Sequence, residues 1–277
     1  MSGGFTQVQL DELKGYGLLA PSADLAAMAG EARIAAAEAK AAEAWEASSP
    51  RKGVEAAQAA LAESVYCPAA LTLLSLFVAR DLPERVRLLK LAFAAGTAAL
   101  GARIESEAGK LGESPRGLAY LEARQHYASA LSVMGDRAGA FGHWREVLRL
   151  DPSDPSRARL DFADALIDAG ENAEADALFA RFADADARAA YAKALLAFRA
   201  NGAGAQADAA LDAALTANGF VPAYLVGDRK PPKTAPLSVD PGSREEAIVV
   251  GVNAAAAWAA TPGAVAWLKE RRRRTTM

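Results

Sequence analysis

The feature that most constrains this chain is a helix-sized segment that recurs after 35 residues. Each copy has a glycine that can end a helix, a small residue five positions later, and a bulky aromatic residue four positions after that. The matching positions are Gly135 with Gly170, Ala140 with Ala175, Trp144 with Phe179, and, in the preceding helix, Tyr127 with Phe162 and Leu131 with Leu166. A small residue lets two helices approach, and a bulky one fills the seam between neighbouring hairpins. The repetition therefore predicts stacked helical hairpins.

A third, looser copy follows, with its turn at Asn201-Gly202, 32 residues after Gly170. A period near 34 residues with this small-then-bulky pattern resembles the tetratricopeptide repeat. The composition is 52% hydrophobic but only 7% aromatic, and alanine dominates it, which favours closely packed helices over a sheet. We therefore expect an all-α fold: a TPR-like helical-hairpin solenoid, or α-α superhelix, of about five hairpins with a C-terminal capping helix pair.

The pattern divides the chain into four segments. They are an N-terminal lead over 1–21, a helical array over 22–217 with an irregular segment at 101–117, a proline-rich loop and capping helices over 218–269, and a basic tail over 270–277. The lead is predicted to be either disordered or a short helix. Within the array, periodicity and proline positions predict helices over 22–45, 52–64, 68–78 and about 83–100.

Short polar and proline signals mark further helix ends. Asp154 before Pro155 has the pattern of an N-cap and a first helical position. Ser243, with Glu246 three residues later, predicts a capping box. The sequence Thr-Pro-Gly at 261–263 predicts a break between the two capping helices.

Bulk properties exclude several classes of function. The net charge of −3 and pI of about 5.6 give no electrostatic case for nucleic acid, and we expect the arginine run 271–274 to be a disordered, solvated tail. Cys67 is the single cysteine, which excludes an intramolecular disulfide and is typical of a buried small hydrophobe.

Residues 247–268 carry no charge but are mostly alanine and are interrupted by proline, so we expect two helices and no membrane span. The start of the chain lacks a secretory signal, and we expect a cytoplasmic protein.

The C-terminal half resembles the suppressor-of-tumorigenicity-seven family, in particular its bacterial relatives. The resemblance covers about 118–268 and rests on the segments ALTANGFVPAYLVG and GVNAAAAWAATPGAVAWL. The matching positions are Asn218, Val221, Pro222, Tyr224, Leu225, Glu246, Ala247, Trp258 and 261–264, with Tyr120, Ala123 and Arg124 farther upstream. The chain departs from the family at Gly219, where relatives tend to have proline, and it lacks the membrane-spanning segments of the eukaryotic members. The resemblance implies a repeat scaffold and supplies no catalytic residue.

A helical repeat array binds its partner through the exposed face of its inner helices. The residues predicted to form such a binding site are Tyr120, Glu122, Arg124, Gln125, His126, Arg157, Asp161, Tyr191 and Arg199. Tyrosine and arginine often dominate interfaces. The expected anchors are therefore the two tyrosines and two arginines Tyr120, Arg124, Tyr191 and Arg199. A solvated helix face would contain the same residue types, and the sequence leaves that alternative open.

Candidates for catalysis are few. Glu122 and His126 are four residues apart and could pair as acid and base, although ordinary surface pairs have the same spacing; His143 is also interpreted as a surface residue. Two histidines and one cysteine give no metal-ligand spacing, and no phosphate-binding loop is present, so we expect no cofactor and no metal. We therefore expect a non-catalytic scaffold that binds a peptide or partner helix of unknown identity. The alternative is a small-molecule-binding or hydrolytic protein with a pocket between the array and its cap.

Overall fold

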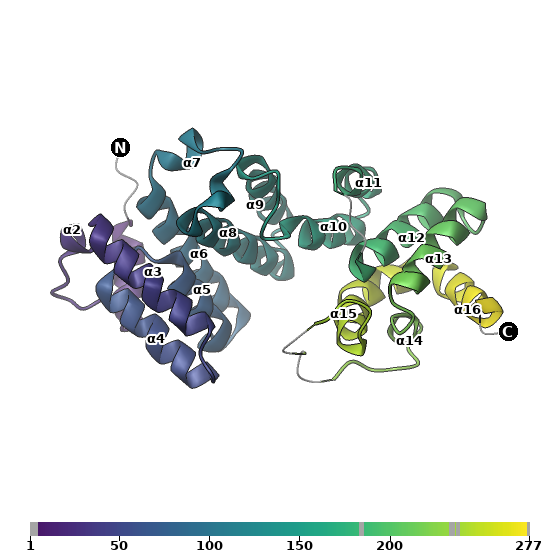
Figure 1. The fold of residues 1–277 in the computed structure, drawn as a ribbon, viewed down its shortest axis with the longest axis horizontal. Coiled ribbons are helices and arrows are strands. Elements are labelled where there is room, and N and C mark those ends of the chain that lie inside the picture. The colour runs from purple at the N-terminus through teal and green to yellow at the C-terminus, as the bar shows by residue number, and fades with distance from the viewer. Residues whose placement is uncertain (1–4, 183–185, 233–235, 237–238, 276–277) are drawn as a thin grey trace. The chain divides into compact units, whose positions relative to one another are not determined.

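The computed structural model describes residues 5–182, 186–232, 236 and 239–275, and none of these residues lies in a strand (Figure 1). The chain divides into two compact units, Met1–Ala158 and Arg159–Met277. The first unit holds α1 (Gln7–Gly15), α2 (Leu25–Met28), α3 (Glu31–Trp45), α4 (Pro50–Glu63), α5 (Pro68–Phe77), α6 (Leu82–Leu100), α7 (Arg103–Ser106), a 3-10 helix (Leu111–Glu113), α8 (Pro115–Met134) and α9 (Arg137–Leu150). From the boundary onward follow α10 (Ala158–Ala169), α11 (Asn172–Ala180), α12 (Ala187–Asn201), α13 (Ala205–Ala217), α14 (Pro222–Leu225), α15 (Arg244–Ala260) and α16 (Ala264–Thr275). The predicted all-α class is confirmed. The boundary between the units falls inside the segment 22–217.

Neighbouring helices in the first unit run antiparallel. The start of α4 lies against the end of α3, because a Cβ atom on Gly53 would lie 2.9 Å from the carbonyl oxygen of Ala44. The end of α6 meets the start of both α5 and α8: a Cβ atom on Gly96 would lie 3.4 Å from Cγ of Pro68 and 2.8 Å from Cδ2 of Tyr120. Helices α5 and α8 therefore point the same way. Helix α3 starts beside both, since Glu31 at its start pairs with Arg116 at the start of α8, and Met28 just before it accepts a hydrogen bond from Ser64 just before α5. The carboxyl ends of α3, α5 and α8 thus lie at the same end of the unit.

The hairpin of α8 and α9 forms as the repeat pattern predicts. Gly135 takes the left-handed conformation, with a φ of 91°, and ends α8. Asp136 then caps α9 by accepting a hydrogen bond from the amide of Gly139 at 3.0 Å. Trp144 is only 1% exposed, and Gly170 repeats the left-handed turn with a φ of 81°. The glycine and aromatic positions of the repeat are confirmed in these two turns.

The helix predicted over 22–45 is wrong, because the structure breaks it at Gly30. Asp24 starts α2 by accepting hydrogen bonds from the amides of Ala26 and Ala27. Gly30 has an extended backbone and is the N-cap of α3. Ser64 Oγ donates a 2.7 Å hydrogen bond to the carbonyl of Met28, which satisfies one of the acceptors exposed by the break. Glycine has low helix propensity, and this partner from another segment stabilises the interruption.

The predicted helix start at Asp154 and Pro155 is also wrong. Asp154 has a φ of 51°, and α10 begins only at Ala158. The carboxylate of Asp154 nevertheless accepts a hydrogen bond from the amide of Ala158 at 2.8 Å. The aspartate therefore caps the helix through a longer turn than the sequence pattern suggests.

The capping helices begin and separate as predicted. Ser243 accepts a hydrogen bond from the amide of Glu246, but the Glu246 carboxylate reaches back to the amide of Gly242 at 2.7 Å, so the reciprocal bond of the capping box moves by one residue. The break at 261–263 separates α15 from α16. Across the described residues no single helix has the length and apolarity of a membrane span; α15 and α16 up to Arg273 pass that test only as a pair bent by 118°.

The arginine run is not the disordered tail that the sequence predicts, because α16 continues to Thr275. Arg271 donates to Asp208 at 3.2 Å and to Asp212 at 2.6 Å, both on α13. Two carboxylates on a neighbouring helix therefore hold the start of the run.

Candidate functional site

The nine predicted site residues are divided between the two units. The first unit holds Tyr120, Glu122, Arg124, Gln125, His126 and Arg157, and the second holds Asp161, Tyr191 and Arg199. Their burial and bonding decide which of them can contact another molecule.

Tyr120 and Arg124 are part of the packing of the first unit. Tyr120 is 2% exposed, and its hydroxyl accepts a 3.0 Å hydrogen bond from Nη1 of Arg124. The guanidinium of Arg124 lies over the ring of Phe93, 5.1 Å from its centroid, and 3.8 Å from a carboxylate oxygen of Glu146. The prediction that Tyr120 is a surface anchor is wrong, and Arg124 is largely enclosed by this cluster.

His143 completes the same cluster, and the prediction of a surface histidine is wrong. Its ring makes edge contacts with Phe93 and Tyr127, at centroid distances of 5.3 and 5.0 Å. Burial, with a smaller contribution from the charge of Arg124, lowers the pKa of His143 to about 4. Nδ1 has no hydrogen-bond partner among the described residues. The histidine is therefore neutral at physiological pH and packs as an aromatic ring.

The remaining predicted residues of the first unit keep some exposure. Glu122, Gln125 and His126 are all half-buried on α8. Burial raises the pKa of the Glu122 carboxyl. Arg157 is exposed and has a φ of 57°, in the turn before α10. These four residues can still face a partner, whereas Tyr120 cannot.

The predicted anchors of the second unit are used internally. Tyr191 is fully buried, and its hydroxyl donates a 2.9 Å hydrogen bond to the carbonyl of Asn218. Arg199 donates from Nη1 to the carbonyl of Ile167 at 2.7 Å and from Nε to Oγ1 of Thr261 at 2.9 Å. Its further acceptors are Asn172 Oδ1 and the carbonyl of Ala257. Burial lowers the pKa of the Arg199 guanidinium, which remains charged. The prediction that Tyr191 is a partner-binding anchor is therefore wrong, because its side chain is fully buried, whereas Arg199 is half-buried and bonded mainly within its own unit.

Asp161 is likewise paired within its unit. Arg188 of α12 donates 2.7 Å hydrogen bonds to Asp161 and Asp164 of α10. This ion pair joins two helices of the second unit.

A solvent-open groove of about 500 Å³ lies in the second unit, over α12 and between α11 and α13. Its lining residues are Asn172, Ala173 and Asp176 from α11, Lys193, Leu196, Ala197, Arg199 and Ala200 from α12, and Gln206 and Ala210 from α13. Alanines make up much of its surface, so the backbone of a docking segment can come close. The ammonium group of Lys193 lies over the ring of Phe179, with Nζ 5.4 Å from the ring centroid. The sequence pattern gave no signal for Asp176, because the groove depends on how three helices pack.

A second cavity of the same unit, of about 660 Å³, lies beside the capping helices. It is lined by residues 167–170 and Asn172, by Phe198, Arg199 and Gly202 of α12, and by Ala260, Thr261 and Pro262. Its place matches the pocket expected between the array and its cap. It is open to solvent, and Arg199 fills part of its polar lining with bonds to its own unit.

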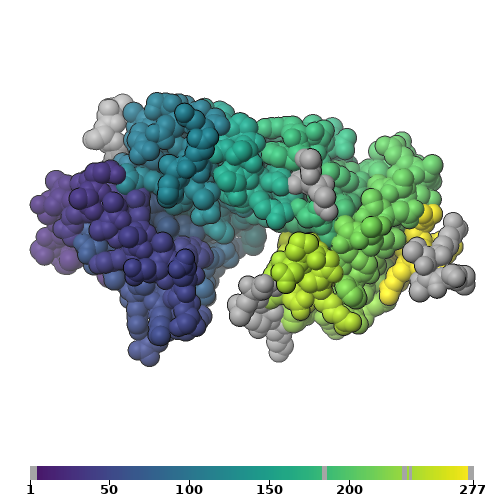
Figure 2. Space-filling model, viewed as in Figure 1, coloured from purple at the N-terminus to yellow at the C-terminus, as the bar shows by residue number. Residues whose placement is uncertain are grey.

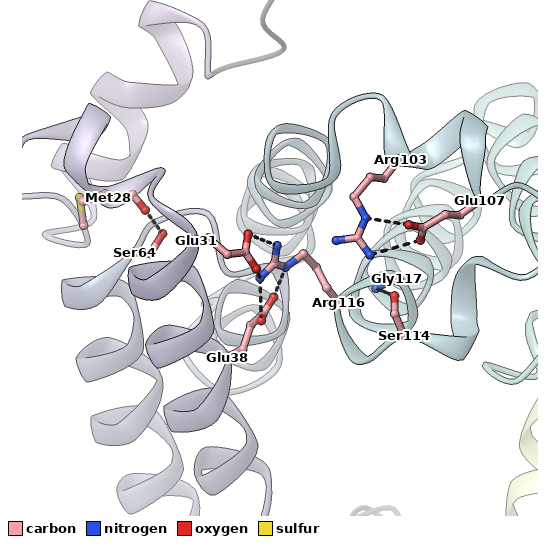
Figure 3. Close-up of polar contacts among 9 residues, drawn as sticks. All are labelled: Met28, Glu31, Glu38, Ser64, Arg103, Glu107, Ser114, Arg116 and Gly117. Atoms are coloured by element: carbon pink, nitrogen blue, oxygen red, sulfur yellow. Dashed lines mark hydrogen bonds and ion pairs between the residues drawn. The ribbon is translucent and has the colours of Figure 1, made fainter.

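A buried arginine with two carboxylate partners lies at the start of α8. Arg116, whose side chain is 8% exposed, reaches across to Glu31 and Glu38 of α3 (Figure 3). Its Nη2 lies 2.8 Å from a Glu31 oxygen. The two carboxylates satisfy the guanidinium, so this cluster joins α3 to α8 and has no open coordination position.

The described residues contain no group of three or more histidine, cysteine, aspartate or glutamate side chains placed to hold a metal ion. The geometry thus defines the class as an all-α protein of packed helical hairpins with open grooves. In comparisons with known proteins, no family model, no curated protein and no solved structure matches the chain.

Proposed function

We propose that this protein is a non-catalytic interaction scaffold built from TPR-like hairpins, and that it binds a peptide or helix of a partner protein. The observation that carries the proposal is the open groove over α12, which is floored by alanine and flanked by charged side chains. The groove is open to solvent, and its small alanine side chains let the backbone of a docking segment of another protein come close. The partner segment packs against the exposed side of α12.

The polar residues of the groove give the chemistry of the partner. Asp176 on one wall and Lys193 on the floor present opposite charges, with Gln206 on the other wall. A helix with small residues on its docking face and both charge signs along its edges would complement this arrangement. The alanine floor contributes close packing, and the charges select orientation.

The experiment compares groove variants with a matched control in the same unit. Ala197→Trp fills the groove, Lys193→Glu reverses its floor charge, and Lys230→Glu reverses a charge on an exposed residue outside the lining. Tagged proteins are used to capture partners from the native host, and each captured partner is then titrated in purified form. We expect both groove variants to weaken binding at least about tenfold, which is about 1.4 kcal/mol. Equal binding by all three variants contradicts the proposal.

The cavity beside the cap favours a second candidate function, the binding of a small molecule. Asn172 and Thr261 supply polar atoms to it, and Phe198 supplies an aromatic face. A ligand of this cavity should raise the melting temperature of the native protein but not that of Ala260→Trp, whose side chain would occupy the space. A screen of small polar molecules by thermal shift tests this. If no compound distinguishes the two proteins, this candidate is excluded.

A further inference from the structure

Six exposed apolar residues gather at one end of the first unit. Trp45 is the last residue of α3, Phe77 is the last of α5, and Met134 is the last of α8. The full set, which we name the tip row, consists of Trp45, Leu76, Phe77, Val78, Val133 and Met134. Exposure is 47% for Trp45, 50% for Phe77 and 74% for Val133. Most of the large apolar side chains that the described residues expose thus lie at three helix ends.

These ends are adjacent in space. Helices α3, α5 and α8 point the same way, and α5 contacts both of the others. The row therefore runs from the end of α3, over the end of α5, to the end of α8. The tip of the α3–α4 hairpin projects from its unit in the space-filling view, where another molecule can reach it (Figure 2).

The exposed apolar area of the tip row is large among the described residues. Half-exposed aromatic and aliphatic side chains of these sizes together expose on the order of 500 Å². The largest patch on a typical monomer is about 300–600 Å² and often has a function. A standard interface buries about 800 Å² on each partner, so the tip row with its polar rim is large enough for a stable contact.

Charged residues of both signs lie around the row, and two oppositely charged pairs form among them. Arg51 lies 2.9 Å from Glu55, and Arg80 lies 2.9 Å from Glu84, which is itself buried. Asp81 caps its helix, as Asp136 does. Its carboxylate accepts a 2.8 Å hydrogen bond from the backbone amide of Glu84. The rim therefore has no excess of one sign that would attract a polyanion, an anionic membrane or a strongly charged partner, or that would repel a copy of itself.

We propose that the tip row is a self-association surface, and that its occupant is the tip row of a second copy of this chain. A closed dimer has twofold symmetry, so the same patch is used on both copies. In the antiparallel arrangement the central α5 ends meet near the axis, and the α3 end of each copy faces the α8 end of the other. Trp45 then packs against Val133 and Met134 of the second copy.

Sedimentation equilibrium of the full chain over a hundredfold range of concentration tests the association. We expect a mass approaching twice 28.8 kDa for the native protein at the highest concentration. Val133→Asp should weaken the dimer at least about thirtyfold, because it places a charge in an apolar contact. Val8→Asp is the matched control, since Val8 is a valine with 69% exposure on α1, outside the row. Both positions are exposed, so circular dichroism should show unchanged helicity and melting.

Two results would overturn the proposal. One is a native protein that stays monomeric up to about 200 µM, a concentration far above the dissociation constant of a standard interface. The other is a dimer that Val133→Asp and Val8→Asp weaken equally. Binding of the monomer to phospholipid vesicles in place of dimerisation would assign the row to a membrane instead.

A cysteine pairing experiment tests the antiparallel geometry. Trp45→Cys and Met134→Cys proteins are mixed and mildly oxidised; the native Cys67 is fully buried and can remain. We expect the mixed disulfide dimer to form several times faster than either self-pair. Preferential self-pairing of the Trp45→Cys protein contradicts the proposed arrangement.

Discussion

At the residue scale, the polar groups of this protein mostly serve its own packing. Arg199 gathers acceptors from three separate segments, and Arg116 joins two helices through Glu31 and Glu38. His143 is enclosed by aromatic rings. Long or aromatic polar side chains therefore fix the hairpins in place.

The enclosure of His143 predicts a dependence of stability on pH. An unfolded histidine titrates near 6.5, whereas burial lowers the pKa of His143 in the folded state to about 4. Between these values the unfolded chain binds the extra proton, so the free energy of unfolding falls as the pH falls from about 6.5 to 4. Partial exposure limits the loss to about 1–2 kcal/mol. His143→Phe should remove this part of the pH dependence in urea denaturation; identical pH profiles for both proteins would refute the assignment.

The clamp formed by Arg199 predicts a large effect of its removal. Arg199→Ala removes the hydrogen bonds to the carbonyl of Ile167, to Oγ1 of Thr261 and to Oδ1 of Asn172, and should lower the free energy of unfolding by about 2–3 kcal/mol. Arg199→Lys should recover only part of this, because an ammonium group cannot reproduce the fork of a guanidinium. Arg229→Ala, at an exposed position, is the control, with an expected change below about 0.5 kcal/mol. Denaturant titrations followed by circular dichroism measure all three.

At the element scale, the helices meet where side chains are small. The late part of α6 lies against α5 and α8 at Gly96, and α4 meets α3 at Gly53. The turns, by contrast, use glycine for its backbone freedom, as at Gly135. The same residue type thus has two roles, and the packing distances distinguish them.

Two helical glycines of the first unit should respond to alanine in opposite ways. At Gly96 an added Cβ atom would lie 2.8 Å from Tyr120, so Gly96→Ala should destabilise the protein by about 1–3 kcal/mol through overpacking. At Gly142 on α9 no atom lies within 4 Å of the added Cβ, and Gly142→Ala should stabilise by about 0.5–1 kcal/mol. Thermal melts of the two variants measure the difference. Changes of the same sign would show that helix contact is not what keeps Gly96 small.

At the scale of the whole molecule, the chain consists of two compact units, each with its own core. The core of the first unit includes residues from α1 through α8, such as Leu13, Leu71 and Ala123. The second unit packs Trp258 against Tyr191 and Trp267. Each unit buries aromatic or aliphatic side chains among its own helices.

The first unit should therefore fold on its own. Residues 1–157 expressed alone are expected to show strong helical circular dichroism and a single cooperative thermal transition, because their core is formed within the unit. A broad, non-cooperative melt would show that the unit requires the rest of the chain. The full-length protein measured under the same conditions is the reference.

Local patterns predicted the elements of this fold well and the site poorly. The turn at Gly135 and the buried Trp144 follow from periodicity, because neighbouring residues determine them. The break at Gly30 depends on Ser64, 34 residues away in the chain, and the role of Arg199 depends on Thr261, 62 residues away. A helical period identifies which face of a helix is apolar, but it does not reveal which polar residue on that face finds a partner from a distant segment.

The buried thiol of Cys67 can report how often the surrounding part of the first unit opens. This single thiol lies fully buried at the start of α5, and desolvation raises the pKa of Cys67 to about 11. A thiol reagent in solution can modify it only during the moments when that region opens, since the thiolate is the reacting form and the closed state keeps it protonated and out of reach. The rate of labelling, compared with that of a short unstructured peptide, converts directly into the fraction of time for which the first unit is open.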